Sequence, residues 1–273
     1  MHVNVNDKFS NKKGLSNYSY NKKVIFKYSI NVIDSQLILN IYTNDSNKSH
    51  FNKTVLGSFI FNNSVKYSAS KIVIITNSKL DLDILVFGFL QKDFLYSIYK
   101  KNSNKSQFKT NYKLSKNYLS LLNSINFLKE LVSEPSNIIY PNSFVKRTLG
   151  KVNKKNVDIK NLNKEKIKKI GLNCLLAVAQ GSKREPSVME FSKKNNKKNV
   201  DILFVGKGVC FDSGGISIKP SGGMEDMKWD MAGAAVTVSI IKYLSEIKTN
   251  FSYAGIVGLV ENMPSSTAYK PGD

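Results

Sequence analysis

The sequence has little cysteine and histidine, and this scarcity excludes several classes of protein. Two cysteines, Cys174 and Cys210, are too few for a disulfide framework or a cysteine-rich zinc site. We therefore expect each to be a small core residue. Both histidines, His2 and His50, have polar neighbours, and no Ser, Cys or metal-ligand spacing accompanies them. Surface positions are expected for these two histidines.

Long apolar runs are also lacking. No segment holds about 18 consecutive apolar residues, so we expect no membrane span. No N-terminal stretch joins basic residues to an apolar run, so we expect no signal peptide. Together with the few cysteines, these absences favour a protein of the reducing cytoplasm.

Acidic residues are outnumbered, with 20 Asp and Glu against 41 Lys and Arg, a net charge of +21. One hypothesis is a basic protein that binds nucleic acid, because clustered cations attract phosphates. The other is a sequence that is rich in Lys, Asn and Ile throughout. Lysine tracts such as residues 164–169 and 193–198 flank periodic segments, as solvated faces and loops do. This spread does not favour nucleic-acid binding, which remains an alternative.

The remaining composition is that of a folded protein, at 41% hydrophobic and 22% charged residues. A chain of 273 residues is long enough for two domains. We expect residues 1–23, rich in Asn, Ser and Lys, to form a loosely ordered extension. Residues 24–115 are predicted to form an N-terminal mixed α/β domain, residues 116–137 a linking helix, and residues 138–273 a second α/β domain.

The first half of the chain mixes the two kinds of periodicity. Short runs rich in β-branched and aromatic residues predict strands. These runs are Val24–Ile30, Gln36–Tyr42, Leu56–Phe61 and Lys71–Thr76. Apolar residues at helical spacing predict helices over Leu82–Tyr99 and Asn117–Val132, the second ended by Pro135.

The second half alternates between strand and helix patterns. Helices are predicted at Asn142–Leu149 and Asp230–Ile247, a short helix or turn at Lys164–Ile170, and strands at Val157–Ile159, Val200–Val205 and Tyr253–Val260. A glycine-rich loop is predicted from Gly206 to Gly223. The alternation favours an α/β sheet with functional loops at the ends of its strands.

Residues 205–220 read V-G-K-G-V-C-F-D-S-G-G-I-S-I-K-P, so that charged residues stand among glycines. A P-loop is excluded because Lys219 precedes Pro220, and a dinucleotide fingerprint because Phe211 replaces its last glycine. Asp230 could be a helix N-terminal residue favoured by the dipole. Asp212, Asp230 and the two lysines of the segment also form a set of oxygen and nitrogen donors suited to a divalent metal.

This segment, together with M-K-W-D-M-A-G-A-A at residues 227–235, resembles the leucyl (cytosol) aminopeptidases. The resemblance extends to L-V-S-E-P-S-N at 131–137, to L-L-A-V-A-Q-G-S at 175–182, and to E-N-M-P-S and K-P-G-D between 261 and 273. It covers roughly residues 117–273. The resemblance implies that residues 138–273 are the first half of a catalytic domain, whose central sheet is flanked by helices.

The resemblance also implies a role for each candidate residue. Lys207 and Asp230 would bind one metal, Asp212 would bridge two metals, Lys219 would stabilise the oxyanion, and Met227 would line the pocket for the N-terminal side chain. Two divalent ions, Zn²⁺ or Mn²⁺, are implied for each full-length subunit. Peptides with a free N-terminus are the implied substrates, and the full-length protein is implied to be a homohexamer.

One departure from the family pattern concerns the remaining ligands. In the family, an Asp and a Glu ligand and an anion-binding Arg lie in an N-T-D-A-E-G-R motif downstream of P-G-D, whereas this sequence stops at Asp273. We therefore expect a partial sequence that is inactive alone. The alternative is a non-catalytic relative that acts as an interaction module.

Overall fold

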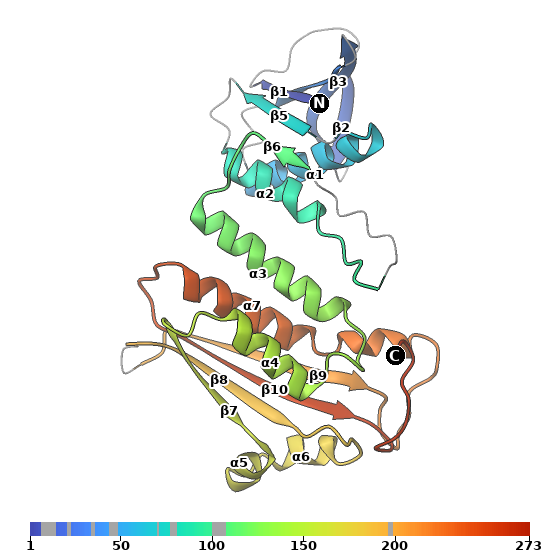
Figure 1. The fold of residues 1–273 in the computed structure, drawn as a ribbon, viewed down its shortest axis with the longest axis vertical. Helices are drawn as coiled ribbons and strands as arrows, with labels where there is room; N and C mark the ends of the chain where they lie inside the picture. Colours follow the sequence, from blue (N-terminus) through green and yellow to red (C-terminus); the bar gives the residue numbers. More distant parts are fainter. Residues whose placement is uncertain are drawn as a thin grey trace. The chain divides into compact units, whose positions relative to one another are not determined.

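The computed structural model describes residues 1–6, 15–20, 23–33, 36–43, 49–69, 71–76, 81–99, 108–195 and 199–273. The chain forms two compact units, Met1–Leu122 and Asn123–Asp273. Each unit has its own sheet and helices (Figure 1). The division falls inside α3 (Lys116–Ser133), the helix that was expected to link two domains.

The N-terminal unit contains a six-stranded sheet in the order β2-β3-β4-β1-β5-β6. Its strands are β1 (His2–Asn6), β2 (Ser16–Tyr20), β3 (Lys23–Ile33), β4 (Gln36–Thr43), β5 (Lys71–Thr76) and β6 (Lys109–Thr110). Strands β2, β3 and β4 pair antiparallel, whereas β4, β1, β5 and β6 pair parallel. The unit is therefore mixed α/β, as predicted.

Strand β1 lies inside this sheet, between β4 and β5, and buries Val3 and Val5. The expectation of a loosely ordered extension is therefore wrong for the residues of β1 and β2. Val3 and Val5 are two residues apart, which is the side-chain period of a strand, so both side chains point into the core. Residues 7–14 and 21–22 of the expected extension lie outside the described residues.

Two helices of this unit, α1 (His50–Lys66) and α2 (Leu82–Lys92), pack on each other. The strand predicted at Leu56–Phe61 is wrong, because these residues lie in α1. A Cβ at Gly57 would clash with the carbonyl oxygen of Leu85, and a Cβ at Gly88 with that of Thr54. The close helix contact made possible by these glycines overrides the strand preference of the aromatic residues. The helix predicted to reach Tyr99 ends at Lys92.

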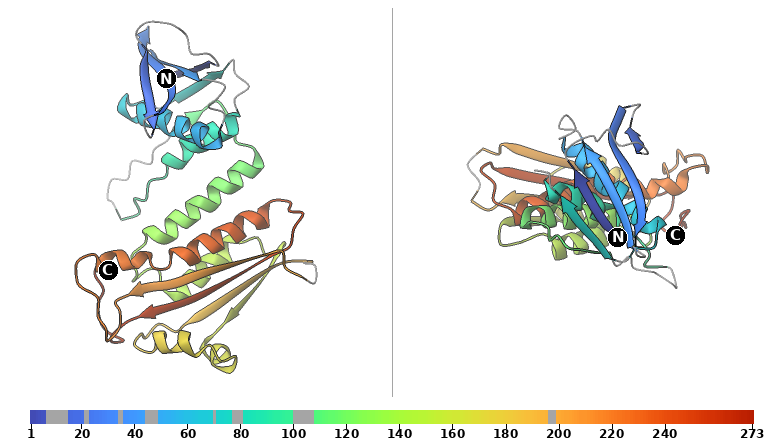
Figure 2. Two further views of the ribbon diagram at one scale, coloured as in Figure 1. Left: turned by 180° about the vertical axis from the view of Figure 1, so that it is seen from behind. Right: turned by 90° about the horizontal axis from the view of Figure 1, so that it is seen from above.

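The second unit contains a four-stranded sheet in the order β7-β8-β10-β9. Its strands are β7 (Val157–Leu162), β8 (Ser187–Lys193), β9 (Ile202–Asp212) and β10 (Tyr253–Asn262). Strand β8 pairs antiparallel with β7 and β10, whereas β9 runs parallel to β10. Helices α4 (Pro141–Lys151) and α7 (Ala232–Glu246) cover one face, and α5 (Lys164–Lys169) and α6 (Asn173–Ala179) lie on the other (Figures 1 and 2).

The core of this unit lies under α7, where Ala234, Val238 and Ile241 pack with Phe191 and Val257 of the sheet. The predicted helices and strands of this half are present, with bounds shifted by a few residues except in β9, whereas β8 and α6 were not predicted. The fold class is therefore confirmed: a mixed α/β unit followed by a central sheet flanked by helices. None of the helices in the described ranges is long and apolar enough to cross a membrane.

Strand β9 is longer than predicted, because it continues through Gly206 and Gly208 to Asp212. The expectation that a loop begins at Gly206 is therefore wrong. A Cβ at Gly206 would lie 2.7 Å from the carbonyl oxygen of Gly233 in α7, and one at Gly208 would lie 2.5 Å from that of Gly258 in β10. These glycines serve the close packing of α7 and β10 on the strand.

The two cysteines differ in exposure. Cys210 is buried in β9, as expected, at 1% relative exposure. Cys174 is exposed in α6, so the expectation of a core position is wrong for this residue. Helix α6 has seven residues, and Ala179 is its buried one.

Candidate functional site

The candidate residues lie where β9 ends and α7 begins. Lys207 lies within β9 and Asp212 at its end, whereas Asp230 directly precedes Met231, the N-cap of α7. Lys219 lies in the loop between them, and Met227 lies in the 3₁₀ helix Met224–Trp229. The structure joins all five in one chain of contacts. The N–H of Asp230 donates to the Met227 carbonyl at 3.2 Å, and the Lys219 amine lies 3.3 Å from the Met227 sulfur.

The first pair is formed by Lys207, whose Nζ donates to Oδ1 of Asp230. The lysine side chain is 61% exposed and the aspartate 21%. Gly233 lets α7 approach β9 at this pair, because a Cβ there would lie only 3.1 Å from the backbone nitrogen of Lys207. Oδ2 of Asp230 is buried and has no hydrogen-bond partner among the residues that the structure describes. A buried acceptor without a partner is costly, so this oxygen is suited to a ligand.

The second pair is formed by Lys219, whose Nζ donates to Oδ2 of Asp212. Oδ1 of Asp212 accepts from Nδ2 of Asn262 at 2.8 Å and from the Gly214 N–H at 3.0 Å. Burial alone would raise the pKa of Asp212. The hydrogen bonds from Lys219, Asn262 and Gly214 outweigh burial and hold this pKa below the ordinary aspartate value. Asp212 therefore keeps its negative charge to a lower pH than an ordinary aspartate, and its hydrogen bonds orient the carboxylate.

The loop after Asp212 folds back because two glycines adopt left-handed backbone angles. Gly214 has φ of +89° and Gly215 has φ of +67°, and a Cβ at Gly214 would clash with the Ser217 carbonyl. The N–H of Lys219 donates to the Ser213 carbonyl at 2.9 Å. The glycines thus permit the turn that returns Lys219 to Asp212.

The donor atoms fit part of a divalent-metal site. Across the described ranges, no group of three or more His, Cys, Asp and Glu side chains is placed to hold a metal. Lys207, Asp212 and Asp230 instead offer an amine and two carboxylates, which are donors that Zn²⁺ and Mn²⁺ accept. The free Oδ2 of Asp230 is the observation that fits a cation best.

Sequence reasoning missed Asn262 as part of this site. It is the last residue of β10, and its register partner is Asp212 at the end of β9. The signal was available, because neighbouring parallel strands end at the same edge of a sheet. However, an asparagine at a strand end carries no motif of its own.

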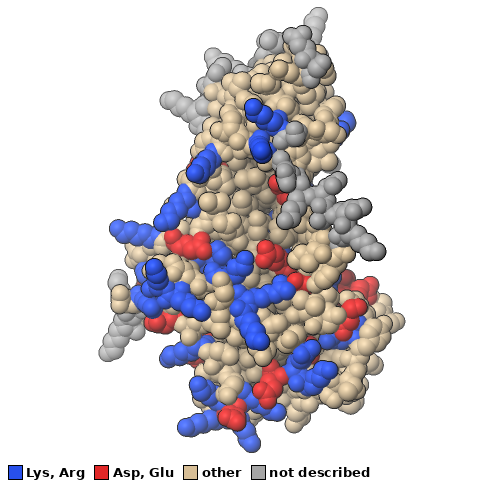
Figure 3. Space-filling model, in the orientation of Figure 1, with Lys and Arg blue, Asp and Glu red and all other residues tan. Residues whose placement is uncertain are grey.

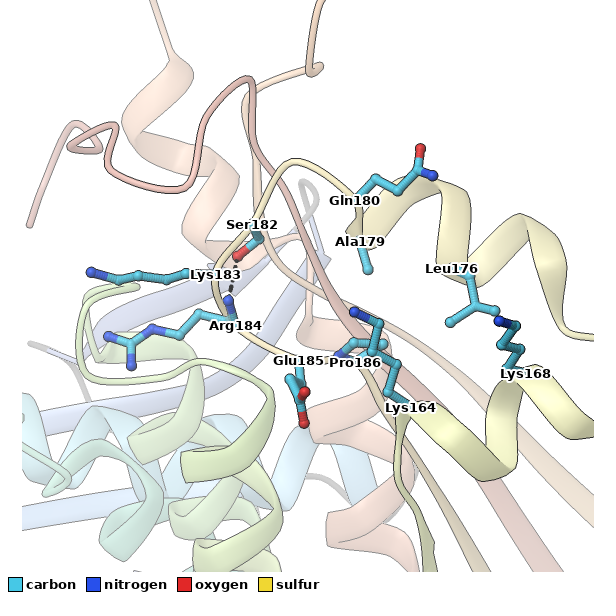
Figure 4. A pocket seen from close by; sticks show the side chains of 10 residues that line it. All are labelled: Lys164, Lys168, Leu176, Ala179, Gln180, Ser182, Lys183, Arg184, Glu185 and Pro186. Atoms are coloured by element: carbon cyan, nitrogen blue, oxygen red, sulfur yellow. Dashed lines mark hydrogen bonds between the residues drawn. The ribbon is translucent and has the colours of Figure 1, made fainter.

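A cavity of about 480 Å³ lies elsewhere in the unit, beside α5 and α6 (Figure 4). It is lined by Lys164, Lys168, Leu176, Ala179, Gln180, Ser182, Lys183, Arg184, Glu185 and Pro186. Its cations do not converge, because Lys183 and Arg184 extend away from Lys164 and Lys168, the lysines of α5 that line the cavity (Figure 4). The Arg184 guanidinium lies 3.7 Å from the centre of the Tyr140 ring instead.

Basic side chains elsewhere are mixed with acidic ones. On the face seen in Figure 3, Lys and Arg alternate with Asp and Glu and do not gather in one stripe. This face therefore gives no support to the alternative of a nucleic-acid-binding protein, which would need clustered cations.

Residues 126–273 match the model of the cytosol aminopeptidase family, catalytic domain. The chain belongs to the cytosol aminopeptidase family. The match includes both lysine–aspartate pairs and Asn262, and it confirms the resemblance drawn from the sequence motifs.

Relatives of this aminopeptidase-family chain are longer than the chain itself. The probable cytosol aminopeptidase of Phytoplasma mali is 40% identical over 233 residues, which are 77% of this chain and 46% of that protein. The chain thus spans less than half the length of this relative.

Two solved structures share the fold. The bottromycin maturation enzyme BotP, solved in complex with Mn, has a TM-score of 0.75 at 21% identity, covering 100% of this chain and 62% of that one. A variant of tomato leucine aminopeptidase has a TM-score of 0.72 at 22% identity, covering 90% of this chain and 52% of that one.

Proposed function

We propose that this chain supplies part of the catalytic centre of a divalent-metal-dependent aminopeptidase, which removes N-terminal residues from peptides. One observation carries the proposal: the buried Oδ2 of Asp230 has no hydrogen-bond partner within the described ranges, while its Oδ1 binds Lys207. A buried carboxylate oxygen left open in this way is suited to a cation. The family match supplies the reaction class.

The proposed metal ligands are Lys207, Asp212 and Asp230, with Asp212 shared between two ions, Zn²⁺ or Mn²⁺. A divalent metal held by these residues would supply Lewis-acid polarisation and a water that ionises near neutral pH. Lysine binds a metal only through its neutral amine, so Lys207 would hold the ion in that form. The solved BotP complex with Mn supports manganese as one candidate ion.

Two further residues act on the substrate in this proposal. The ammonium group of Lys219 stabilises the negative charge that develops on the carbonyl oxygen during hydrolysis. Asp212 orients this ammonium through the hydrogen bond to Oδ2. Met227 presents an adaptable apolar side chain to the N-terminal residue of the peptide, and its contact with the Lys219 amine at 3.3 Å supports placing both roles together.

For the full-length protein we further propose a cytoplasmic location and a homohexameric assembly. The support is the family resemblance and the name of the Phytoplasma mali relative, which is called a cytosol aminopeptidase. Size measurement by light scattering on a full-length form tests the assembly.

The first test uses the 273-residue chain itself. We expect the purified chain to bind Mn²⁺ but to release no leucine from leucine p-nitroanilide. The reason is that the described residues offer only three of the family's proposed metal ligands, namely Lys207, Asp212 and Asp230. Asp230→Ala should lose the binding. Binding that is unchanged in Asp230→Ala would contradict the site, and leucine release by the wild-type chain would contradict the predicted inactivity.

The second test measures aminopeptidase activity in a longer protein that contains this chain. The chain is fused to that part of the Phytoplasma mali relative which lies beyond the matched residues, and leucine p-nitroanilide hydrolysis is measured with Mn²⁺. We expect hydrolysis in the fusion and its loss in Lys219→Ala, with Lys183→Ala as a control on an exposed lysine. A folded, metal-loaded fusion with no activity would contradict the proposed function.

A further inference from the structure

Strand β10 is irregular where it reaches the site. Asn262 is the register partner of Asp212, and the register shifts between Val260 and Asn262. One residue, Glu261, lies within this shift. Irregularities of this kind re-aim the side chains that follow them, and they are common beside active sites.

Asn262 contacts the site through both its side chain and its backbone. Its Nδ2 donates to Oδ1 of Asp212 at 2.8 Å. Its carbonyl accepts from the Ser213 hydroxyl at 2.7 Å and from the Ser213 N–H at 3.0 Å. A Cβ at Gly215 would lie 2.9 Å from Oδ1 of Asn262, so the returning loop packs against the amide. Asn262 is thus held against the first residues of the loop that carries Lys219.

The preceding residue anchors this end of the strand. Glu261 is 2% exposed, and its Oε2 accepts from the Ser182 hydroxyl at 2.6 Å. Its buried Oε1 has no hydrogen-bond partner in the described ranges, but it forms an ion pair with Nζ of Lys270 at 3.5 Å, and Lys270 is 7% exposed. A buried carboxylate paired in this way resists displacement, because moving either partner leaves a buried charge uncompensated. The anchor therefore fixes Asn262 from outside the metal site.

The chemistry of the amide suits this position. Asp212 takes three hydrogen bonds, from Lys219, Asn262 and the Gly214 N–H. Lysine is a flexible side chain, whereas the other two donors lie on the anchored strand and on the glycine turn. A neutral amide orients Oδ1 without adding charge, whereas a carboxylate at position 262 would repel Asp212.

We infer that Asn262 is a positioning residue, which holds Oδ1 of Asp212 so that the carboxylate keeps one orientation toward Lys219 and the metal. The inference rests on the proposed function for its metal, but the contacts themselves do not depend on it. Hydrogen-bond partners behind metal ligands fix the orientation of those ligands, and their loss costs roughly 10- to 100-fold in metal affinity.

The test measures Mn²⁺ affinity by titration calorimetry on the 273-residue chain. We expect Asn262→Ala to bind Mn²⁺ about 10- to 100-fold more weakly than the wild type. Asn262→Gln keeps an amide donor and should recover part of the loss. Asn161→Ala, which changes an exposed asparagine of β7, should bind as the wild type does. Thermal unfolding curves show that each variant is folded, and equal affinity in the wild type and Asn262→Ala overturns the inference.

A second measurement separates this inference from the proposed metal site. The Gly214 N–H donates to the same Oδ1 of Asp212 as Asn262 does. If the loss of Asn262 lets the Asp212 carboxylate move, the hydrogen bond from Gly214 weakens as well. Without metal, we expect the Gly214 amide hydrogen to exchange roughly tenfold faster in Asn262→Ala, as for one weakened hydrogen bond. If the wild type binds no Mn²⁺, the metal site is wrong and the exchange rate decides the role of Asn262. Unchanged exchange overturns that role, and Asn262→Gln provides the same measurement if the alanine variant does not fold.

Discussion

The two lysine–aspartate pairs of the site use the same residue types but differ in how fully their carboxylates are bonded. Both oxygens of Asp212 have partners, namely Lys219 on one oxygen and Asn262 and Gly214 on the other. Asp230 has Lys207 on one oxygen, and its other oxygen has no partner in the described parts of the chain. The comparison shows one carboxylate that is oriented from within the fold and another that is left open for a ligand.

The largest effect is expected from removing the open carboxylate. Asp230→Asn keeps the shape of the side chain but removes its charge, so Mn²⁺ affinity should fall by more than the roughly 100-fold expected for loss of a supporting hydrogen bond. Asp226→Asn, at an exposed acid of the 3₁₀ helix Met224–Trp229 that precedes Asp230, should bind Mn²⁺ normally. Titration calorimetry checks both. An equal loss in both variants would mean that general charge, and no defined site, attracts the metal.

A smaller effect is expected from a substitution that disturbs the packing beside one lysine–aspartate pair and leaves the other pair intact. Gly206→Ala places a methyl group 2.7 Å from the Gly233 carbonyl oxygen, so α7 must shift away from β9. We expect a loss of about 1–3 kcal/mol in the free energy of unfolding, measured in urea, because overpacked cores strain. The Lys207–Asp230 pair joins β9 to the residue just before the N-cap of α7 and should weaken, whereas Lys219–Asp212 should persist.

The control for this variant is Gly222→Ala, where an added Cβ meets nothing within 4 Å. Its free energy of unfolding should stay within about 0.5 kcal/mol of the wild type, as for a surface substitution. If Gly222→Ala destabilised the protein as much as Gly206→Ala, close packing of α7 on β9 would not be the cause.

The smallest effect is expected in how the free energy of unfolding depends on pH through Asp212, the carboxylate whose two oxygens both have partners. The pKa of Asp212 is lowered in the folded state, so the unfolded chain binds the proton first as the pH falls. The stability that Asp212 contributes is therefore complete above the unfolded value of about 4 and is lost as the pH falls through the lower folded pKa. Urea unfolding should show the difference between wild type and Asp212→Asn shrinking below about pH 4.

Asp158→Asn provides the contrast for this pH experiment. Its side chain is 61% exposed and lies 3.9 Å from the Lys194 amine. Surface pairs contribute about 0–1 kcal/mol, so Asp158→Asn should differ little from the wild type at every pH. A pH dependence as large as that of Asp212→Asn would assign the acid effect to general charge.

Much of the second unit could be predicted because its elements follow simple periods. Ala234, Val238 and Ile241 recur at helical spacing, and all three are fully buried on the face of α7 that packs on the sheet. The five candidate residues were brought together by motif and family pattern. Asn262 was missed because an asparagine at a strand end carries no motif, although the pairing of β10 with β9 places it beside Asp212.

The errors in the first unit have a different cause. The run at 56–61 is rich in aromatic and β-branched residues, but contact between Gly57 and α2 makes it helical. A helix start was nevertheless visible in Ser49, whose hydroxyl accepts from the Asn52 N–H at 3.2 Å. The composition of residues 1–23 concealed β1, whose two valines show the strand period only when they are separated from the polar residues around them.

The contrast between the two thiols gives the molecule an internal reporter. Burial raises the pKa of the Cys210 thiol, and the Glu261 carboxylate raises it further, whereas Cys174 is exposed. Because the thiolate is the reactive form, an alkylating reagent should modify Cys174 at once and reach Cys210 only when β9 separates from its neighbours. The slow phase of alkylation would therefore time the opening of the strand that carries Lys207 and Asp212, without any label being added to the protein.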